Sequence, residues 1–482
     1  MFVAGDLLPL SIVESKHFLK LTHDLDPKFQ VPSRKHLSTK LLQEKAREIQ
    51  SLLKEQLNNA EHICLTVDLW SNRSMKGFLG ITAHFILGWE LKSAMIACRR
   101  FKGRHTGENI LHEYEEIISN FDINKNIFCI ISDNATNMVK AFNFGVPGFA
   151  SSVVKDNEEE LFTDSDVEDT GDEEEHPFPS HKRCYAHCLQ LVIKDAFDKS
   201  DNSLRKIIVK VSKLVSHVRK SIHASELLEE EKRVQASNAT RWNSQLHMIQ
   251  SVLNIPEQKM EKIDCPGISS YDRKVLLEVT KILKPFEDAT LLLQREKSVS
   301  GSMTISITFG LKKHLDAIKC DYSSKFLSVL KSSLNSRLSH FETDETYQLA
   351  SMLDPRFKLL WAAQENTDGL VSLLQKNASS CDASISDGED SDTSPPNKKH
   401  KSDDFFNFLP KSTPKRQRHT SERSQLVQRY LDEPTLESSA DPLLFWKTNE
   451  HFNRKLFTVT KCMQIESGKM FSHLENEHGC RA

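Results

Sequence analysis

Two short apolar runs in this chain each end on a carboxylate. The first, Ile63 to Val67, consists of strand-forming residues and is followed by Asp68. The second, Ile127 to Ser132, is followed by Asp133 in the same way. Because a buried strand delivers its last side chain to a fixed place, the two carboxylates predict a metal site of the magnesium kind. Aspartate before a small polar residue is also ordinary turn and helix-start chemistry, so this second interpretation stays open.

The segment between these two runs shows a mixed pattern of strand and helix. Alternation predicts strands at 78–87 and 91–98, joined by a turn at 88–90. Thr106 is placed to cap a helix whose apolar face ends at Phe121. The predicted order is therefore strand, strand, strand, helix, strand.

Two further stretches have helical periodicity. A long amphipathic helix is predicted to open at Pro32 and to keep one apolar face as far as Leu57. From Leu204 to about Ala363 the chain is predicted to be mainly helical, with apolar stripes that indicate core packing rather than a cofactor site.

The composition limits the class of protein. A chain of 482 residues has material for several domains, and 38% hydrophobic with 27% charged residues fits a globular protein with polar inserts. A formal net charge of -3 means that any DNA-binding surface must be local. Ten cysteines without paired spacing predict a reduced intracellular compartment. No signal peptide or membrane-spanning run is predicted.

Two low-complexity stretches interrupt the periodic pattern. Residues 156–176 are dominated by Asp and Glu, and residues 377–424 are rich in Ser, Asp, Pro and Lys, so both are predicted to lack a fixed fold. The second stretch carries two basic clusters with the spacing of a bipartite nuclear localisation signal. They consist of Lys398, Lys399, Lys401, Lys415, Arg416 and Arg418. We therefore expect a nuclear protein, although a solvated charge run is the alternative.

Four sequence segments carry a resemblance to a known family. They are LTVDLWS (65–71), ISDNATNM (131–138), RCYAHCLQL (183–191) and ATRWNS (239–244). Their order and spacing resemble hAT-type DNA transposases and, more narrowly, the animal BED-finger proteins derived from them. The resemblance implies an α/β ribonuclease H-like catalytic fold interrupted by a large all-α insertion domain. In that fold the first and fourth strands are neighbours, so Asp68 and Asp133 would converge.

The resemblance and the pattern together predict five parts. These are a helical N-terminal segment (1–60), a ribonuclease H-like core (61–200) with the acidic loop at 156–176, a helical insertion domain (201–376), a linker (377–424) and a partial C-terminal dimerisation region (425–482).

The resemblance also implies roles for single residues. Asp68 and Asp133 would be remnant catalytic carboxylates that hold Mg²⁺ or Mn²⁺ weakly if at all. Cys184 and His187 match the family element that lies beside the carboxylates and shapes the site. With His181 and Cys188 they could instead bind zinc, but structural zinc sites usually draw paired ligands from two segments, and no second pair is apparent. A core cysteine and a capped histidine are the plainer alternative.

The ATRWNS segment suggests a nucleic-acid contact. The family's Trp, here Trp242, stacks on a base beside the cleavage site, and Arg241 is suited to bind phosphate. Trp242 could equally be a packed core aromatic, and the sequence leaves both interpretations open.

The end regions depart from the family pattern. The segment at 441–447 resembles the start of the family's dimerisation region, with Leu443, Leu444, Phe445 and Trp446 as its apolar residues. The third catalytic carboxylate, a glutamate in a Ser-Glu-Arg motif, is not recognisable beyond it, since Glu466 lacks the expected neighbours and Ser421–Arg423 lies in the linker. No counterpart of the zinc-binding BED finger precedes the resemblance. We therefore expect weak self-association and no strong reader of DNA sequence.

Three functions fit these expectations. The favoured one is a domesticated transposase-like nuclear protein without catalytic activity, which acts as a DNA-associated or protein-binding regulator of transcription. The second is an active metal-dependent DNA transposase or nuclease. The third is a protein-interaction scaffold that does not bind nucleic acid. DNA and nuclear proteins are the expected partners, and no membrane association is expected.

Overall fold

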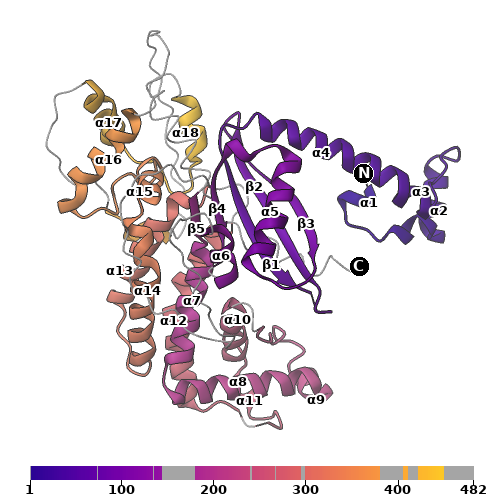
Figure 1. Ribbon diagram of the computed structural model, residues 1–482. Helices are drawn as coiled ribbons and strands as arrows, with labels where there is room; N and C mark the ends of the chain where they lie inside the picture. The colour runs from indigo at the N-terminus through magenta and orange to yellow at the C-terminus, as the bar shows by residue number, and fades with distance from the viewer. Residues whose placement is uncertain are drawn as a thin grey trace.

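A mixed five-stranded sheet is the centre of the molecule (Figure 1). The computed structural model describes residues 2–72, 74–133, 135–143, 180–238, 242–265, 267–294, 299–379, 405–410 and 422–449. The strands are β1 (Ile63–Ser71), β2 (Gly77–Leu87), β3 (Glu90–Phe101), β4 (Ile127–Ser132) and β5 (Ser180–Arg183). Their order across the sheet is β3-β2-β1-β4-β5. β2 is antiparallel to both β1 and β3, whereas β4 is parallel to both β1 and β5.

This sheet confirms the predicted mixed α/β character and places β1 beside β4. Three details differ from the sequence prediction. β1 continues to Ser71, so Asp68 lies inside the strand and not at its end. β3 continues to Phe101, three residues beyond the predicted end at Cys98. β5 was not predicted at all, because its four residues, Ser-His-Lys-Arg, lie at the edge of the sheet and show no apolar alternation. Arg183 is the last residue of this strand.

Helices cover both faces of the sheet. On one face α5 (Gly107–Phe121) lies across the strands, as Figure 1 shows, and Leu65 and Val67 of β1 point into the core beneath it. Thr106 caps this helix as predicted, since its hydroxyl accepts a hydrogen bond from the Asn109 N–H. On the other face Cys64 of β1 belongs to a second core. That core also contains α7 (Tyr185–Lys199), and α6 (Thr136–Asn143) follows β4.

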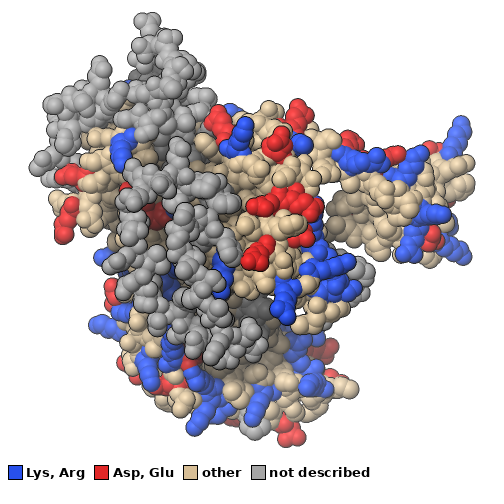
Figure 2. All heavy atoms as spheres, viewed as in Figure 1, with Lys and Arg blue, Asp and Glu red and all other residues tan. Residues whose placement is uncertain are grey.

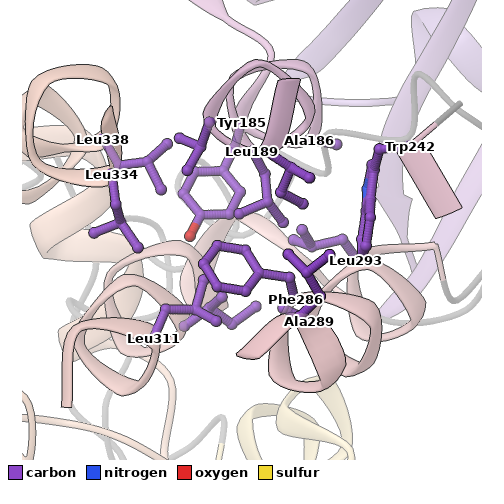
Figure 3. Packing of buried hydrophobic residues seen from close by; sticks show 14 of the residues in the cluster. Tyr185, Ala186, Leu189, Trp242, Phe286, Ala289, Leu293, Leu311, Leu334 and Leu338 are labelled. Carbon is purple, nitrogen blue, oxygen red and sulfur yellow. The ribbon is translucent and has the colours of Figure 1, made fainter. Parts of the chain in front are cut away.

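A large helical region follows α7. Its elements are α8 (Asn202–Lys220), α9 (Ile222–Leu227), α10 (Trp242–Leu253), α11 (Glu257–Met260), α12 (Ser270–Leu293), α13 (Thr304–Ala317), α14 (Ser324–Thr343), α15 (Glu345–Met352), α16 (Thr367–Ser379), α17 (Glu422–Asp432) and α18 (Pro442–Thr448). α14 packs along α7, where Asp195 binds Arg337 Nε at 2.6 Å and Ser333 Oγ at 2.7 Å. Figure 3 shows the apolar contacts of this core, with Tyr185 facing Leu334 and Leu338.

An N-terminal helical arm extends from the other side of the sheet (Figure 1). It contains α1 (Phe2–Gly5), α2 (Lys16–Leu25), α3 (Arg34–His36), a π-helical turn (Leu37–Leu41) and α4 (Leu42–Asn58). Leu57 at the end of α4 is fully buried and anchors the arm to the α5 core. Among the described helices, none has the length and apolarity needed to cross a membrane.

A buried polar cluster ties the loop after α15 to the last two helices. Arg356 binds the fully buried Asp354 carboxylate in a bidentate manner, with Nε at 2.9 Å and Nη2 at 2.6 Å, and the Ser302 hydroxyl donates to the same carboxylate at 2.6 Å. Lys358 is fully buried with a positive φ of 47°, and its ammonium donates to the carbonyls of Tyr430 and Glu433 near the end of α17. These contacts satisfy charges that would otherwise be costly to bury.

Part of the predicted linker has structure. A 3-10 turn at Phe405–Phe408 lies inside residues 377–424, and Phe406 is buried with its ring 4.7 Å from that of Phe357. α17 also begins within this stretch. The residues around these phenylalanines are mostly polar, so the sequence shows no helical periodicity there.

Candidate functional site

Two carboxylates come together where the pairing of β1 with β4 ends. Val67 of β1 pairs with Ser132 of β4 in parallel register, so Asp68 is the next residue of β1 and Asp133 the first residue after β4. The preceding residues of both strands are buried, which fixes the strand ends. The Asp133 carboxylate accepts a hydrogen bond from the Ala135 N–H at 3.2 Å, as expected for an aspartate that begins a turn into α6.

The two carboxylates repel each other at neutral pH. The pKa of the Asp68 carboxyl is raised from 3.8 to about 6. Burial is the larger cause of this shift, and the negative charge of Asp133 is the second. A divalent cation between the two groups would remove this repulsion, so the pair fits the oxygen ligands of Mg²⁺ or Mn²⁺. In the described part of the chain, however, no cluster of three or more His, Cys, Asp or Glu side chains could hold a metal ion. The pair alone supplies two ligands.

Cys184 and His187 lie beside the carboxylates at the start of α7. The Cys184 N–H donates to the Ser132 carbonyl at 2.9 Å, which joins the helix start to the end of β4. Burial raises the pKa of the Cys184 thiol to about 12, so the free thiol is neutral at pH 7. Burial also lowers the pKa of His187, although the negative charge of Asp133 opposes that shift. Both groups are therefore uncharged neighbours of the acidic pair.

The zinc alternative gains no support from the neighbouring residues. His181 Nε2 lies 2.8 Å from the Ser132 hydroxyl, and its ring lies against Phe142 with 5.5 Å between centroids. Burial raises the pKa of Cys188 to about 11. These contacts are those of packed core residues.

Trp242, the first residue of α10, is 9% exposed and belongs to the helical core. Figure 3 shows its ring beside Ala186 and Leu293. This placement accords with the interpretation as a packed aromatic, and stacking on a base stays a prediction. Arg241 lies outside the described residues, as do the acidic stretch 156–176 and the six residues of the nuclear localisation signal.

The four apolar residues expected to dimerise lie on α18. Trp446 is fully buried within its own chain, where its Nε1–H donates to the Leu353 carbonyl at 2.9 Å and its ring lies 5.0 Å from that of Tyr430. Leu443 is buried and Phe445 partly buried, whereas Leu444 is 60% exposed. Of these four residues, only Leu444 offers a large apolar surface to a partner.

Sequence reasoning missed the residues next to Asp68 on the same face of the sheet. Trp70 lies two positions beyond Asp68 on β1, and its ring stacks with that of Phe78 on β2 at a centroid distance of 5.9 Å. The sequence contains this signal, because residues two apart on a strand share one face, which places Trp70 on the same face as Asp68.

Comparisons with known proteins agree with this arrangement. Residues 66–144 match the family model of the ZBED1 RNase-like domain, and residues 182–276 match that of the ZBED1 RNase-like helical domain. The chain is 24% identical over 466 residues to the human Zinc finger BED domain-containing protein 4 and 24% identical over 371 residues to the Putative AC transposase of Zea mays. It is 21% identical over 393 residues to the human Zinc finger BED domain-containing protein 6.

The shared segments cover most of this chain but less than half of each relative. They amount to 92% of this chain and 38% of the human protein 4, and to 73% of this chain and 43% of the maize protein. The fold, the carboxylate pair and these matches show that the chain resembles proteins derived from hAT-type DNA transposases. Within that class, the two family models and two of these relatives make it similar to the ZBED-like proteins.

Proposed function

We propose that the chain is a domesticated transposase-like protein without strand-cleaving activity, which acts in the nucleus as a DNA-associated or protein-binding regulator. The Asp68–Asp133 pair carries this proposal. Two-metal strand cleavage needs a ligand set larger than two carboxylates, and losing a ligand lowers affinity and rate by orders of magnitude. The Putative transcriptional regulator tpeD of Talaromyces stipitatus, 21% identical over 357 residues, supports the regulatory part.

The finer architecture belongs to the same proposal. The strand order supports a ribonuclease H-like core, and the helices from α8 to α16 would be an all-α domain inserted into that core. The predicted boundaries at 60, 200, 376 and 424 then separate the arm, the core, the insertion, the linker and the C-terminal helices.

Cleavage of plasmid DNA tests the inactive assignment. Purified protein is incubated with supercoiled plasmid in millimolar Mg²⁺ or Mn²⁺, beside the Asp68→Ala variant. We expect the same background nicking from both proteins. Manganese-dependent nicking that disappears in Asp68→Ala would instead establish the active nuclease alternative.

Nuclear localisation is tested at the two basic clusters. Replacing Lys398, Lys399 and Lys401 together with Lys415, Arg416 and Arg418 by Ala should move a tagged protein to the cytoplasm. A matched control replaces six exposed lysines elsewhere. Nuclear accumulation that persists after the cluster replacement would remove these clusters from the argument.

Self-association should be weak. Because Trp446 and Leu443 are buried in their own chain, only Leu444 remains exposed among the apolar residues expected to dimerise, far short of the roughly 2,000 Å² of an obligate interface. We expect a monomer, or a dimer with micromolar dissociation, by sedimentation velocity. A dimer that persists at nanomolar concentration in the Leu444→Glu variant would mean that another surface pairs the chains.

A further inference from the structure

The face of the sheet that carries Asp68 also carries a row of aromatic and basic side chains outside the carboxylate pair. Asp68 and Trp70 are two residues apart on β1, so they point to the same face. Trp70 is paired with Phe78, and Phe78 is paired with Arg100 of β3. Directly opposed residues of antiparallel strands share a face, so these three side chains form one row across the sheet. Asp68 and Gly80 open the adjacent row.

The aromatic part of this row is built into the strand. The rings of Trp70 and Phe78 stack with 19° between their planes, and both side chains remain partly exposed. A Cβ atom at Gly80 would lie 2.6 Å from the Trp70 ring, so this ring covers the glycine beside Asp68. Only a residue without a side chain allows the ring to lie so close to the sheet. The result is a partly open aromatic surface next to the acidic pair.

Basic residues also follow β2 and β3 at this end of the sheet, and Figure 2, which views the sheet from the α5 side, shows Lys and Arg gathered near its lower end. Four of them are exposed, namely Lys76, Arg100, Lys102 and Arg104. Among the ion pairs within the described ranges, none involves these four. Arg99, on the opposite face, differs because it binds Glu116 at 2.7 Å. Within the described residues, the cations on the Arg100 side therefore have no acidic partner.

We propose that this surface binds a single strand of DNA and leads it past Asp68. We call it the aromatic-basic surface, made of Trp70, Lys76, Phe78, Arg100, Lys102 and Arg104. A base would stack on the Trp70–Phe78 pair while the cations bind the flanking phosphates, the combination that holds single strands without reading sequence. This inference rests on the proposed DNA association. It adds that the bound DNA is single-stranded and names the residues that contact it.

Binding of a labelled single strand tests the basic part. Fluorescence anisotropy with a strand of about 20 nucleotides is measured over a salt series for wild type, Arg100→Ala/Lys102→Ala and the control Lys281→Ala/Lys319→Ala. The control removes two exposed cations from the helical region. We expect weaker binding by the first variant alone, with a salt slope smaller by about 1.4 because two phosphate contacts are lost.

Trp70→Ala tests the aromatic part. We expect affinity for the strand to fall roughly 5- to 150-fold at an unchanged salt slope, and Trp70→Phe to recover part of it. Circular dichroism checks that both variants fold, and a duplex of the same sequence should bind more weakly than the strand.

Different results would overturn different statements. If wild type and Arg100→Ala/Lys102→Ala bind the strand equally well, the aromatic-basic surface is not the binding site, while DNA association itself stands. If wild type binds neither strand nor duplex at low salt, DNA association fails and this inference fails with it. Equal affinity for polyglutamate would show a general anion surface and would overturn the stacking contact.

Discussion

β1 and the loop after α15 each hold a carboxylate largely away from solvent, but its charge is treated in opposite ways at the two places. Asp354 is compensated within the chain by the bidentate Arg356 and by the Ser302 hydroxyl. Asp68 is instead desolvated by burial and faces the like charge of Asp133 next to an uncharged thiol and imidazole, and its pKa rises to about 6. A charge satisfied internally holds helices together, whereas a pair left in repulsion is suited to an external cation.

The largest effect on stability should come from breaking the compensated cluster, that is, the buried group of Ser302, Asp354 and Arg356. Asp354→Ala would leave the Arg356 guanidinium buried without its partner, which typically costs about 3 to 5 kcal/mol. The free energy of unfolding, measured in urea, should fall by that amount. Asp316→Ala is the matched control, because the Asp316–Lys331 pair lies at the surface.

That prediction has a clear contrary outcome. A loss below about 1 kcal/mol for Asp354→Ala would mean that Arg356 finds another partner or water. The cluster would then not be what holds α17 and α18 against α15.

Removing the charge of Asp68 should change the free energy of unfolding in the opposite direction. Because the folded pKa of Asp68 lies above its unfolded value of 3.8, ionisation destabilises the folded state, and the penalty grows as pH rises from about 4 through about 6. Asp68→Asn removes the charge, so it should stabilise the protein by about 2 to 3 kcal/mol at pH 7.5. At pH 4 little of that gain should remain.

Urea unfolding at pH 4 and pH 7.5 measures this difference. Millimolar Mn²⁺ sharpens it, since the cation should stabilise wild type at pH 7.5 and leave Asp68→Asn unchanged. A gain that is the same at both pH values would refute the role of the Asp68 charge.

The smallest effect should come from the edge of the compensated cluster. Ser302→Ala removes one hydrogen bond to a carboxylate that keeps its two bonds from Arg356, so we expect a loss of about 1 to 2 kcal/mol. Thermal unfolding by calorimetry can resolve it. If Ser302→Ala costs as much as Asp354→Ala, the hydroxyl and the guanidinium act as one unit and not as separate contacts.

Much of the sheet was predictable from the chain. Short apolar runs located β1 and β4, and alternation located β2 and most of β3. The family resemblance placed Asp133 next to Asp68, which periodicity alone could not do. β5 escaped because an edge strand of polar residues has no apolar signature. This strand is part of the site, since it carries His181 and is followed directly by Cys184.

The compensated cluster was not predictable in the same way. Asp354 and Arg356 are two residues apart in a turn, and neither helical nor strand periodicity marks such a pair. The burial of Trp446 depends on a carbonyl 93 positions earlier in the chain, at Leu353. Contacts across that separation follow from tertiary packing, which a local pattern does not contain.

The parallel pairing of β1 with β4 has a consequence for the order of assembly. β1, β2 and β3 are consecutive and joined by short turns, so the stacked Trp70 and Phe78 can form from local contacts. Cys64 and Cys129, which meet where β1 and β4 pair, are 65 residues apart, and closing so long a loop is slow. A refolding chain therefore brings Asp68 next to Asp133 only when β4 docks, so the like charge of Asp133 adds to the burial of Asp68 only at that step.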